Sequence, residues 1–263
     1  MDPLSFAIQC AIDAGELLIR LFHNPESAPQ IKFDQSVVTQ ADFASDQLIS
    51  QAIQRNFPDD LILSEELQPD LNLDDQLASR AVWVIDPLDG TTNFSLGIQI
   101  WGVLLARMVG GWPEIGVAYF PMLKEIYTAQ KGLGAFFNQQ PLVIEPGKHR
   151  GFSFFTCCSR TYNNYHVGVP YKARIFGSSA YTFCAVARNT AILGFETTPK
   201  IWDLAAPWLI VQEAGGVVES FNHVSPLPLR PGIDYSQQVF PTLIACSTKV
   251  LDLARKWIHP KAP

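Results

Sequence analysis

The stretch Trp83-Val84-Ile85-Asp86-Pro87-Leu88-Asp89-Gly90-Thr91-Thr92-Asn93-Phe94 decides how this chain folds and what chemistry it can carry. The apolar run from Ala81 to Ile85 is typical of a buried β-strand. Two carboxylates, Asp86 and Asp89, follow it three residues apart, and Pro87 fixes the turn between them. Side chains placed in this way can converge on cations where the chain leaves the sheet.

The residues that follow Asp89 are suited to binding an anion. Gly90 allows a close approach of the backbone, and Thr91-Thr92 can begin a helix whose free N–H groups receive a phosphate. On the short pattern Asp-Pro-x-Asp-Gly alone, an ordinary surface turn is an equally good interpretation. Other segments of the chain are therefore needed to distinguish a binding site from an ordinary surface turn.

Three further acidic segments lie at predicted ends of helices or strands. Thr39-Gln40-Ala41-Asp42 opens a helix, Ser64-Glu65-Glu66 ends an apolar strand, and Trp202-Asp203 begins an apolar helix. A pocket that held these acidic side chains together with Asp86 and Asp89 would carry a large negative charge, so the carboxylates must protonate or bind cations. Hard oxygen ligands without a nearby His or Cys select Mg²⁺ rather than Zn²⁺.

Several segments resemble the inositol monophosphatase family, within the wider group of magnesium-dependent, lithium-sensitive phosphomonoesterases. Asp86 to Phe94 is similar to the family's first motif, and Trp202 to Gly216 is similar to its second. Four shorter segments occur in family order at similar spacing: Val38-Thr39-Gln40-Ala41-Asp42, Ser64-Glu65-Glu66, Lys131-Gly132-Leu133-Gly134-Ala135 and Gly177-Ser178-Ser179-Ala180. The resemblance implies an α/β fold, the layered αβαβα sandwich of the inositol monophosphatase and fructose-1,6-bisphosphatase type.

The resemblance also implies a centre of two or three Mg²⁺ ions. One ion would be held by Glu65, Asp86 and the carbonyl oxygen of Leu88, and a second by Asp86, Asp89 and Asp203. A weaker third ion would use Glu65 and waters. Because the wider group is lithium-sensitive, Li⁺ is expected to inhibit.

The reaction implied is hydrolysis of a phosphate monoester by in-line attack of a metal-activated water. Asp42 and Thr91 would position the water and help to deprotonate it, and Glu65 would assist. The substrate-binding positions implied by the resemblance are Gly90, Thr91, Gly177, Ser178, Ser179, Glu196 and Asp203.

Three positions depart from the family pattern. Ser36 stands where many members have an acidic residue, and Lys32 is shifted from its usual spacing to Asp42. Because of these two departures, the sequence does not decide whether this chain has the loop that carries the third ion. Arg188 lies where relatives often have a Gly-containing turn. It could bind an additional charge on the substrate, but an ordinary surface arginine is the simpler interpretation.

Periodicity and turn residues predict two halves. Residues 1–145 form an α+β half that carries most metal ligands, and residues 146–263 form an α/β half that carries the substrate-side residues and Asp203. In the first half we expect helices at Leu4–Phe22 and Thr39–Asn56, strands at Leu61–Leu63 and Ala81–Ile85, and an antiparallel meander from Trp101 to Phe137. In the second half we expect strands at Phe152–Cys157, Ala191–Phe195, Val217–Glu219 and Thr242–Cys246, and helices at Ser178–Arg188, Ile201–Ala214 and Leu251–Ile258.

Composition restricts the class of protein further. With 48% hydrophobic and 17% charged residues, the chain is neither disordered nor a coiled coil. The net charge of −6 and the lack of a Lys or Arg run argue against nucleic-acid and membrane partners. The odd number of cysteines, 5, and the lack of a secretory leader favour a reducing cytoplasm and structural thiols. The family resemblance implies a homodimer.

The resemblance to the inositol monophosphatase family implies a phosphoric monoester hydrolase. The first expected substrate is myo-inositol 1-phosphate, which would give inositol and phosphate. Fructose 1,6-bisphosphate, histidinol phosphate and 3′-phosphoadenosine 5′-phosphate are alternatives within the same group of enzymes. Outside that group, the chain could be a non-catalytic homologue, or an enzyme that uses Asp86 as a nucleophile, although it lacks the Asp-x-Asp spacing of such enzymes.

Overall fold

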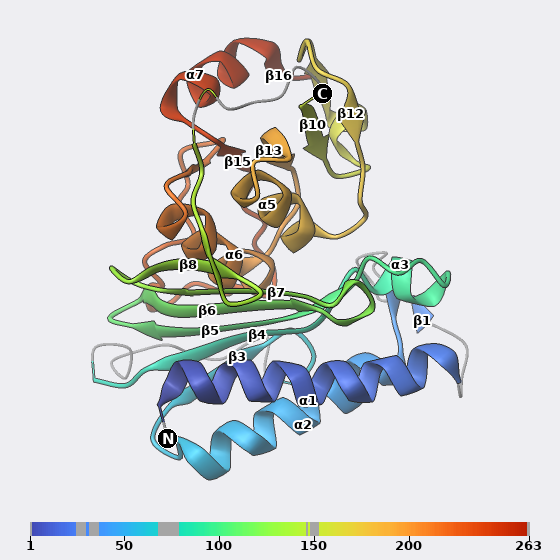
Figure 1. Cartoon of the computed structure of the whole chain (residues 1–263), viewed down its shortest axis with the longest axis vertical. Helices are drawn as coiled ribbons and strands as arrows, with labels where there is room; N and C mark the ends of the chain where they lie inside the picture. The colour runs from blue at the N-terminus through green and yellow to red at the C-terminus, as the bar shows by residue number, and fades with distance from the viewer. Residues whose placement is uncertain are drawn as a thin grey trace.

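The computed structural model describes residues 2–24, 30–31, 37–67, 79–145, 147 and 153–261. Within these residues, helices and sheets alternate in layers (Figure 1). Helices α1 (Pro3–His23) and α2 (Gln40–Asn56) cover one face of a seven-stranded sheet. Helices α5 (Ser179–Ala187) and α6 (Ile201–Glu213) lie between that sheet and a five-stranded one, and α7 (Thr248–Trp257) covers the outer face of the second sheet. The predicted αβαβα sandwich is therefore confirmed.

The seven-stranded sheet has the order β3-β4-β5-β6-β7-β8-β9. Its strands are β3 (Leu61–Ser64), β4 (Val82–Asp89), β5 (Gly102–Val109), β6 (Trp112–Phe120), β7 (Glu125–Gln130), β8 (Gly134–Phe137) and β9 (Gln140–Leu142). Strand β3 pairs with β4 in parallel, and every later neighbour in the sheet is antiparallel. The antiparallel meander that was predicted is present.

The five-stranded sheet has the order β12-β10-β13-β15-β14. Its strands are β10 (Phe154–Cys157), β12 (Ala173–Arg174), β13 (Ala191–Glu196), β14 (Val217–Ser220) and β15 (Thr242–Ala245). Strand β10 is parallel to β13, with Cys157 opposite Phe195, so the two strands end at the same edge of the sheet. The two sheets come from separate parts of the chain, and the domain division after residue 145 stays a prediction.

Helices α1 and α2 each begin at a capping side chain. Asp2 accepts a hydrogen bond from the Ser5 amide at the start of α1, and Pro3 occupies the first turn. Thr39 caps α2 together with Asp42 in a reciprocal capping box, so the segment predicted to open this helix does so. The apolar faces of both helices then pack on the seven-stranded sheet.

Several short elements have no counterpart in the sequence patterns, because two to five residues are too few to show a period. Two pairs of strands are of this kind: β1 (Gln30–Ile31) with β2 (Val37–Val38), and β11 (Tyr165–Val167) with β16 (Ile258–Pro260). Two further elements of this kind are η2 (Pro121–Leu123) and α4 (Thr161–Asn164). The short helix α3 (Thr91–Ser95), in contrast, begins at Thr91, where the sequence predicted a helix to start. Lys32 and Ser36 lie outside the described residues.

The cysteines are unpaired. Cys10, Cys157, Cys184 and Cys246 are buried and Cys158 is half-buried, and all of them are free thiols. Burial in apolar surroundings raises the pKa of Cys157 to about 12, which keeps this thiol protonated and unreactive. No helix among the described residues has the length and apolar character needed to cross a membrane.

Candidate active site

The carboxylates of Asp86 and Asp89 lie within β4, which is buried along its whole length. Asp86 pairs with Leu104 and Asp89 pairs with Gly102, and the register shifts between these two pairs. The intervening Pro87 has no N–H to donate to the ladder, and the Leu88 amide donates instead to Asp86 Oδ1 at 3.0 Å. The prediction of a turn at Pro87 is therefore wrong, because the chain forms a bulge in the strand there.

Asp203 joins these carboxylates from another part of the chain. It lies in the first turn of α6 and accepts a hydrogen bond from the Lys200 amide at 2.6 Å. One carboxylate oxygen from each of Asp86, Asp89 and Asp203 lies within 4.8 Å of the others. Glu65 follows β3, and its amide donates to Ile85 O at 3.2 Å, beside the acidic end of β4.

The donor set fits magnesium. The cluster consists of carboxylate oxygens, and its members Asp86 and Asp89 are buried, with 1% and 4% of their surface exposed. Hard oxygen ligands of this kind match Mg²⁺, and a divalent cation would compensate their charge.

Burial and crowding disfavour the charged form of every carboxyl in the cluster. Burial raises the pKa of Asp86 well above its ordinary value, and the charges of Glu65, Asp203 and Asp89 raise it further. The pKa of Asp203 is raised by burial and by the charges of Asp89 and Glu65. The pKa of Asp89 rises only to about 6, because hydrogen bonds from Ser178 and from nearby amides offset part of the burial effect. A bound cation would relieve this repulsion.

The Thr91 hydroxyl joins two predicted site residues. Its oxygen lies 3.0 Å from Asp42 Oδ1 and 3.0 Å from the carbonyl oxygen of Leu88. Asp42 is buried at 1% exposure, and its second oxygen accepts hydrogen bonds from the Thr39 amide and hydroxyl at 2.8 and 2.7 Å. The Asp42 carboxylate is thereby fixed in orientation and can accept the Thr91 proton.

Gly90 is the N-cap of α3 and lies in the left-handed region with φ of 86°. A Cβ at this position would lie 3.0 Å from the Ile100 carbonyl oxygen. The position therefore favours glycine through both conformation and space. This conformation turns the chain from β4 directly into the helix that carries Thr91.

The first residues of α5 contact the acidic cluster. The Ser178 hydroxyl donates to Asp89 Oδ2, and the Ser179 amide donates to Asp89 Oδ1 at 3.1 Å. Gly177 has φ of 74°, and a Cβ there would lie 2.6 Å from Asn93 Oδ1. Asn93 in turn donates to the Phe176 carbonyl at 2.7 Å, which holds this segment against α3.

Glu196 ends β13 and is 5% exposed. Burial raises its pKa well above the ordinary value, and neighbouring Cys158, Asp89 and Asp203 raise it further. Because it lies this close to the charges of Asp89 and Asp203, it faces the same space as the metal-ligand candidates.

A cavity of about 460 Å³ opens between these elements, which is within the ~300–1,000 Å³ range of small-molecule sites. The predicted site residues that line it are Glu65, Asp86, Leu88, Asp89, Gly90, Thr91, Gly177, Ser178, Ser179, Glu196 and Asp203. Asp42 is absent from the lining and reaches it through Thr91. The structure thus brings the predicted residues together, while the role of each stays a prediction.

Other residues of the lining were not predicted as site residues. They are Thr92, Asn93, Cys158, Ser159, Arg160, Thr198, Pro199, Lys200 and Trp202. Lys200 could have been found from its position three residues before Asp203. No local sequence pattern marks Arg160 as a site residue, because it reaches the cavity only through the parallel pairing of β10 with β13.

Asp46 is a further residue that the sequence argument missed. It is fully buried on α2 and accepts hydrogen bonds from the amides of Glu66 and Leu67 at 3.2 and 3.1 Å. It therefore fixes the segment that carries Glu65. The spacing of four residues from Asp42, which puts both carboxylates on one face of a helix, is the signal that could have revealed it.

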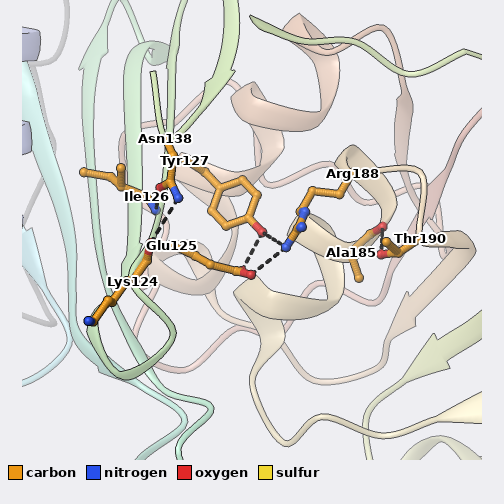
Figure 2. Close-up of polar contacts among 8 residues, drawn as sticks. All are labelled: Lys124, Glu125, Ile126, Tyr127, Asn138, Ala185, Arg188 and Thr190. Atoms are coloured by element: carbon orange, nitrogen blue, oxygen red, sulfur yellow. Dashed lines mark hydrogen bonds and ion pairs between the residues drawn. The ribbon is translucent and has the colours of Figure 1, made fainter. Parts of the chain in front are cut away.

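Arg188 lies away from the cavity, in a cluster between β7 and α5 (Figure 2). Its Nη1 lies 2.6 Å from Glu125 Oε1, and its guanidinium carbon lies 4.2 Å from the centre of the Phe137 ring. The Tyr127 hydroxyl donates to Glu125 Oε2 at 2.8 Å. Arg188 is thus neither a substrate contact nor an ordinary surface arginine, because it joins the first sheet to the C-terminal end of α5.

Comparison with known proteins agrees with this geometry. Residues 2–250 of the chain match the sequence model of the inositol monophosphatase family. The chain is 33% identical over 245 residues to Nus factor SuhB of Pasteurella multocida, which covers 84% of this chain and 86% of that protein. It is 32% identical over 228 residues to histidinol-phosphatase of Chlorobaculum parvum, with 82% and 85% covered.

A solved structure shows the same fold. An IMPase from Thermotoga maritima superposes with a TM-score of 0.80 at 25% identity, over 97% of this chain and 96% of that one. The names of these similar proteins differ, so they do not determine one substrate. The family match covers nearly the whole chain, and one cavity is lined by residues of both long motifs and of two shorter ones, Ser64-Glu65-Glu66 and Gly177-Ser178-Ser179-Ala180. The chain therefore belongs to the inositol monophosphatase family and is a phosphomonoesterase.

Proposed function

We propose that this enzyme hydrolyses a small phosphate monoester with Mg²⁺ as cofactor, and that it accepts myo-inositol 1-phosphate. The observation that carries the proposal is the cluster of Asp86, Asp89 and Asp203, whose oxygens lie within 4.8 Å of one another beside Thr91 in one cavity. Bound Mg²⁺ would lower the pKa of a water molecule and stabilise charge on the phosphoryl group. The number of ions, two or three, is part of the proposal.

The chain's own residues position the nucleophile. The Thr91 hydroxyl donates its proton to Asp42, which leaves the Thr91 oxygen to accept a hydrogen bond from the attacking water. As the water attacks phosphorus, its proton passes to the Thr91 oxygen and the Thr91 proton passes to Asp42. The P–O bond to the alcohol breaks in the same displacement, and the leaving oxygen takes a proton from solvent water. Glu65 lines the same cavity and offers a second carboxylate to orient the water.

The substrate is held from two sides. The amides of Gly90 and Thr91 would bind the phosphate, and Glu196 would accept hydrogen bonds from hydroxyl groups of the leaving alcohol, since all three residues line the cavity. The Ser179 hydroxyl oxygen is buried and has no hydrogen-bond partner among the described residues, so it can serve the same hydroxyl groups. A polyol such as inositol would supply hydrogen-bond partners for both the Glu196 carboxyl and the Ser179 hydroxyl.

Beyond the reaction, we propose a cytoplasmic homodimer without nucleic-acid or membrane partners. The support is the family resemblance, together with the net charge of −6 and the free thiols. Light scattering of the purified protein tests the dimer, since a monomer at micromolar concentration would contradict it.

A phosphate-release screen tests the reaction. The substrates are myo-inositol 1-phosphate, fructose 1,6-bisphosphate, histidinol phosphate and 3′-phosphoadenosine 5′-phosphate, each with Mg²⁺, with EDTA and with added Li⁺. We expect release that requires Mg²⁺ and is inhibited by Li⁺. Release that persists in EDTA would contradict the metal, and no release from inositol 1-phosphate would contradict that substrate.

A further inference from the structure

The first turns of α2 bury a polar face. Asp42, Ser45 and Asp46 lie three and four positions apart, so they share one side of the helix, and each is at most 1% exposed. The later turns bury Ile49 and Ile53, as an amphipathic helix on a sheet ordinarily does. Buried polar side chains cost free energy unless they are hydrogen-bonded, so the partners of this polar face show what it holds.

Ser45 is bonded to the bulge in β4. Its hydroxyl donates to the carbonyl oxygen of Pro87 in a buried hydrogen bond of 2.8 Å. The N–H of the same peptide group, that of Leu88, donates to Asp86 Oδ1 at 3.0 Å. The register of β4 with β5 shifts at this place. The peptide between Pro87 and Leu88 is therefore held by Ser45 on one side and bonded to a metal-ligand candidate on the other.

Asp46 is bonded to the segment that follows β3. Its Oδ2 accepts hydrogen bonds from the amides of Glu66 and Leu67 at 3.2 and 3.1 Å. These amides come directly after Glu65, whose own amide is bonded to β4. The backbone is thus fixed on both sides of Glu65, by β4 before its Cα and by α2 after it.

Asp42, the third residue of the polar face, accepts the hydroxyl proton of Thr91 at the start of α3. One helix therefore reaches three segments of the site that are separate in the sequence. Helix α2 lies against the face of the sheet that contains β4 (Figure 1). Apolar side chains would pack on that face without the cost of burying polar groups, so the polar ones at Ser45 and Asp46 favour a role in the site.

We propose that Ser45 and Asp46 are positioning residues that set the affinity of the site for Mg²⁺. Ser45 orients the peptide that contacts Asp86, and Asp46 orients Glu65. Neither side chain contacts the ion itself. The inference rests on the proposed function, because Mg²⁺ is the ion proposed there. Loss of a group that orients a metal ligand typically weakens metal binding by about 10- to 100-fold.

The first test titrates Mg²⁺ alone into the purified, EDTA-treated protein and measures the dissociation constant by isothermal titration calorimetry. Ser45→Ala should weaken binding about tenfold, because the Pro87 carbonyl loses its donor. Ser225→Ala is the matched control. The Ser225 hydroxyl also donates to a backbone carbonyl, that of Leu227 at 2.7 Å, and Ser225 lies outside the cavity lining. This variant should keep the wild-type dissociation constant.

Asp46 is tested with a pair of variants. Asp46→Ala removes the acceptor of both amides and should weaken Mg²⁺ binding about 10- to 100-fold. Asp46→Asn should recover most of that loss, because its oxygen can accept both amides while its NH2 group donates to the Ser50 hydroxyl, the present partner of Asp46 Oδ1 at 2.9 Å. Excess Mg²⁺ should restore phosphate release in Ser45→Ala and Asp46→Ala, which a general loss of packing would not allow.

The outcomes separate this inference from the proposed function. Equal dissociation constants for Ser45→Ala and Ser225→Ala, or for Asp46→Ala and Asp46→Asn, overturn the inference and leave the proposed function standing. Wild-type protein that binds no Mg²⁺ removes the proposed function, and this inference with it. Thermal unfolding in EDTA shows which variants are folded. If Asp46→Ala is not folded, the comparison of Ser45→Ala with Ser225→Ala decides.

Discussion

At the scale of single residues, the charge of the cluster can be changed without changing its shape. Asp203→Asn keeps an oxygen to accept the Lys200 amide but removes one negative charge from the cation site. We expect Mg²⁺-dependent phosphate release to fall by at least about 100-fold, the upper range seen when a group that supports a metal site is lost. The measurement is initial rate against Mg²⁺ concentration, and Asp89→Asn should behave in the same way.

The control for this prediction is Asp252→Asn, an exposed aspartate of α7. It removes the same charge from the protein as a whole and should leave the rate unchanged. Wild-type turnover in Asp203→Asn would show that this carboxylate is not a metal ligand.

Glu196 gives a second prediction at this scale. Glu196→Gln should raise KM for inositol 1-phosphate more than KM for p-nitrophenyl phosphate, because only the former offers hydroxyl groups to the carboxylate. We expect a difference of about tenfold, since a hydrogen bond to a charged group contributes about 1.5–3 kcal/mol. Equal changes for both esters would remove Glu196 from the substrate site.

At the scale of helices and strands, the cluster around Arg188 fixes the C-terminal end of α5 to β7 (Figure 2). Arg188→Gln would leave Glu125, whose side chain is only 15% exposed, without its cation. We expect a loss of about 1–3 kcal/mol in the free energy of unfolding, which urea denaturation measures. Arg20→Gln changes an exposed arginine of α1 and should cost at most about 0.5 kcal/mol. Equal losses in the two variants would contradict the structural role of Arg188.

The helices and strands also show how much of the fold can be predicted from the sequence. The helices α1, α2, α5, α6 and α7 follow from apolar periodicity and from turn residues at their ends, so they were predicted to within a few residues. The bulge between Asp86 and Asp89 was missed, because it depends on pairing with β5 as well as on the local Asp-Pro-Leu-Asp pattern. The position of Arg160 was also missed, because it depends on the neighbours of β10 in the second sheet. Local sequence patterns predict the helices, the strands and the motifs. Contacts between segments that are distant in the sequence bring the remaining site residues together, and local patterns do not predict them.

At the scale of the whole molecule, the net charge of −6 is unevenly distributed. Part of it belongs to carboxylates that line one cavity, where burial and like charges disfavour ionisation. The folded chain therefore holds protons there that the unfolded chain would release. Because the two states bind different numbers of protons, the free energy of unfolding depends on pH, and it also depends on any Mg²⁺ that replaces these protons.

The sign of that link can be predicted. The folded pKa of Asp89 is about 6 against an ordinary value of 3.8, and those of Asp86 and Asp203 are raised as well. Above the ordinary value the folded state binds more protons than the unfolded state, so these groups make the metal-free protein lose stability as the pH rises through about 6. Mg²⁺ replaces the protons, and it competes with them at low pH. Saturating Mg²⁺ should therefore raise the melting temperature more at pH 8 than at pH 5, as differential scanning fluorimetry would measure. Asp203→Asn should reduce that difference, and an equal Mg²⁺ effect at both pH values would show that the buried carboxylates do not bind the ion.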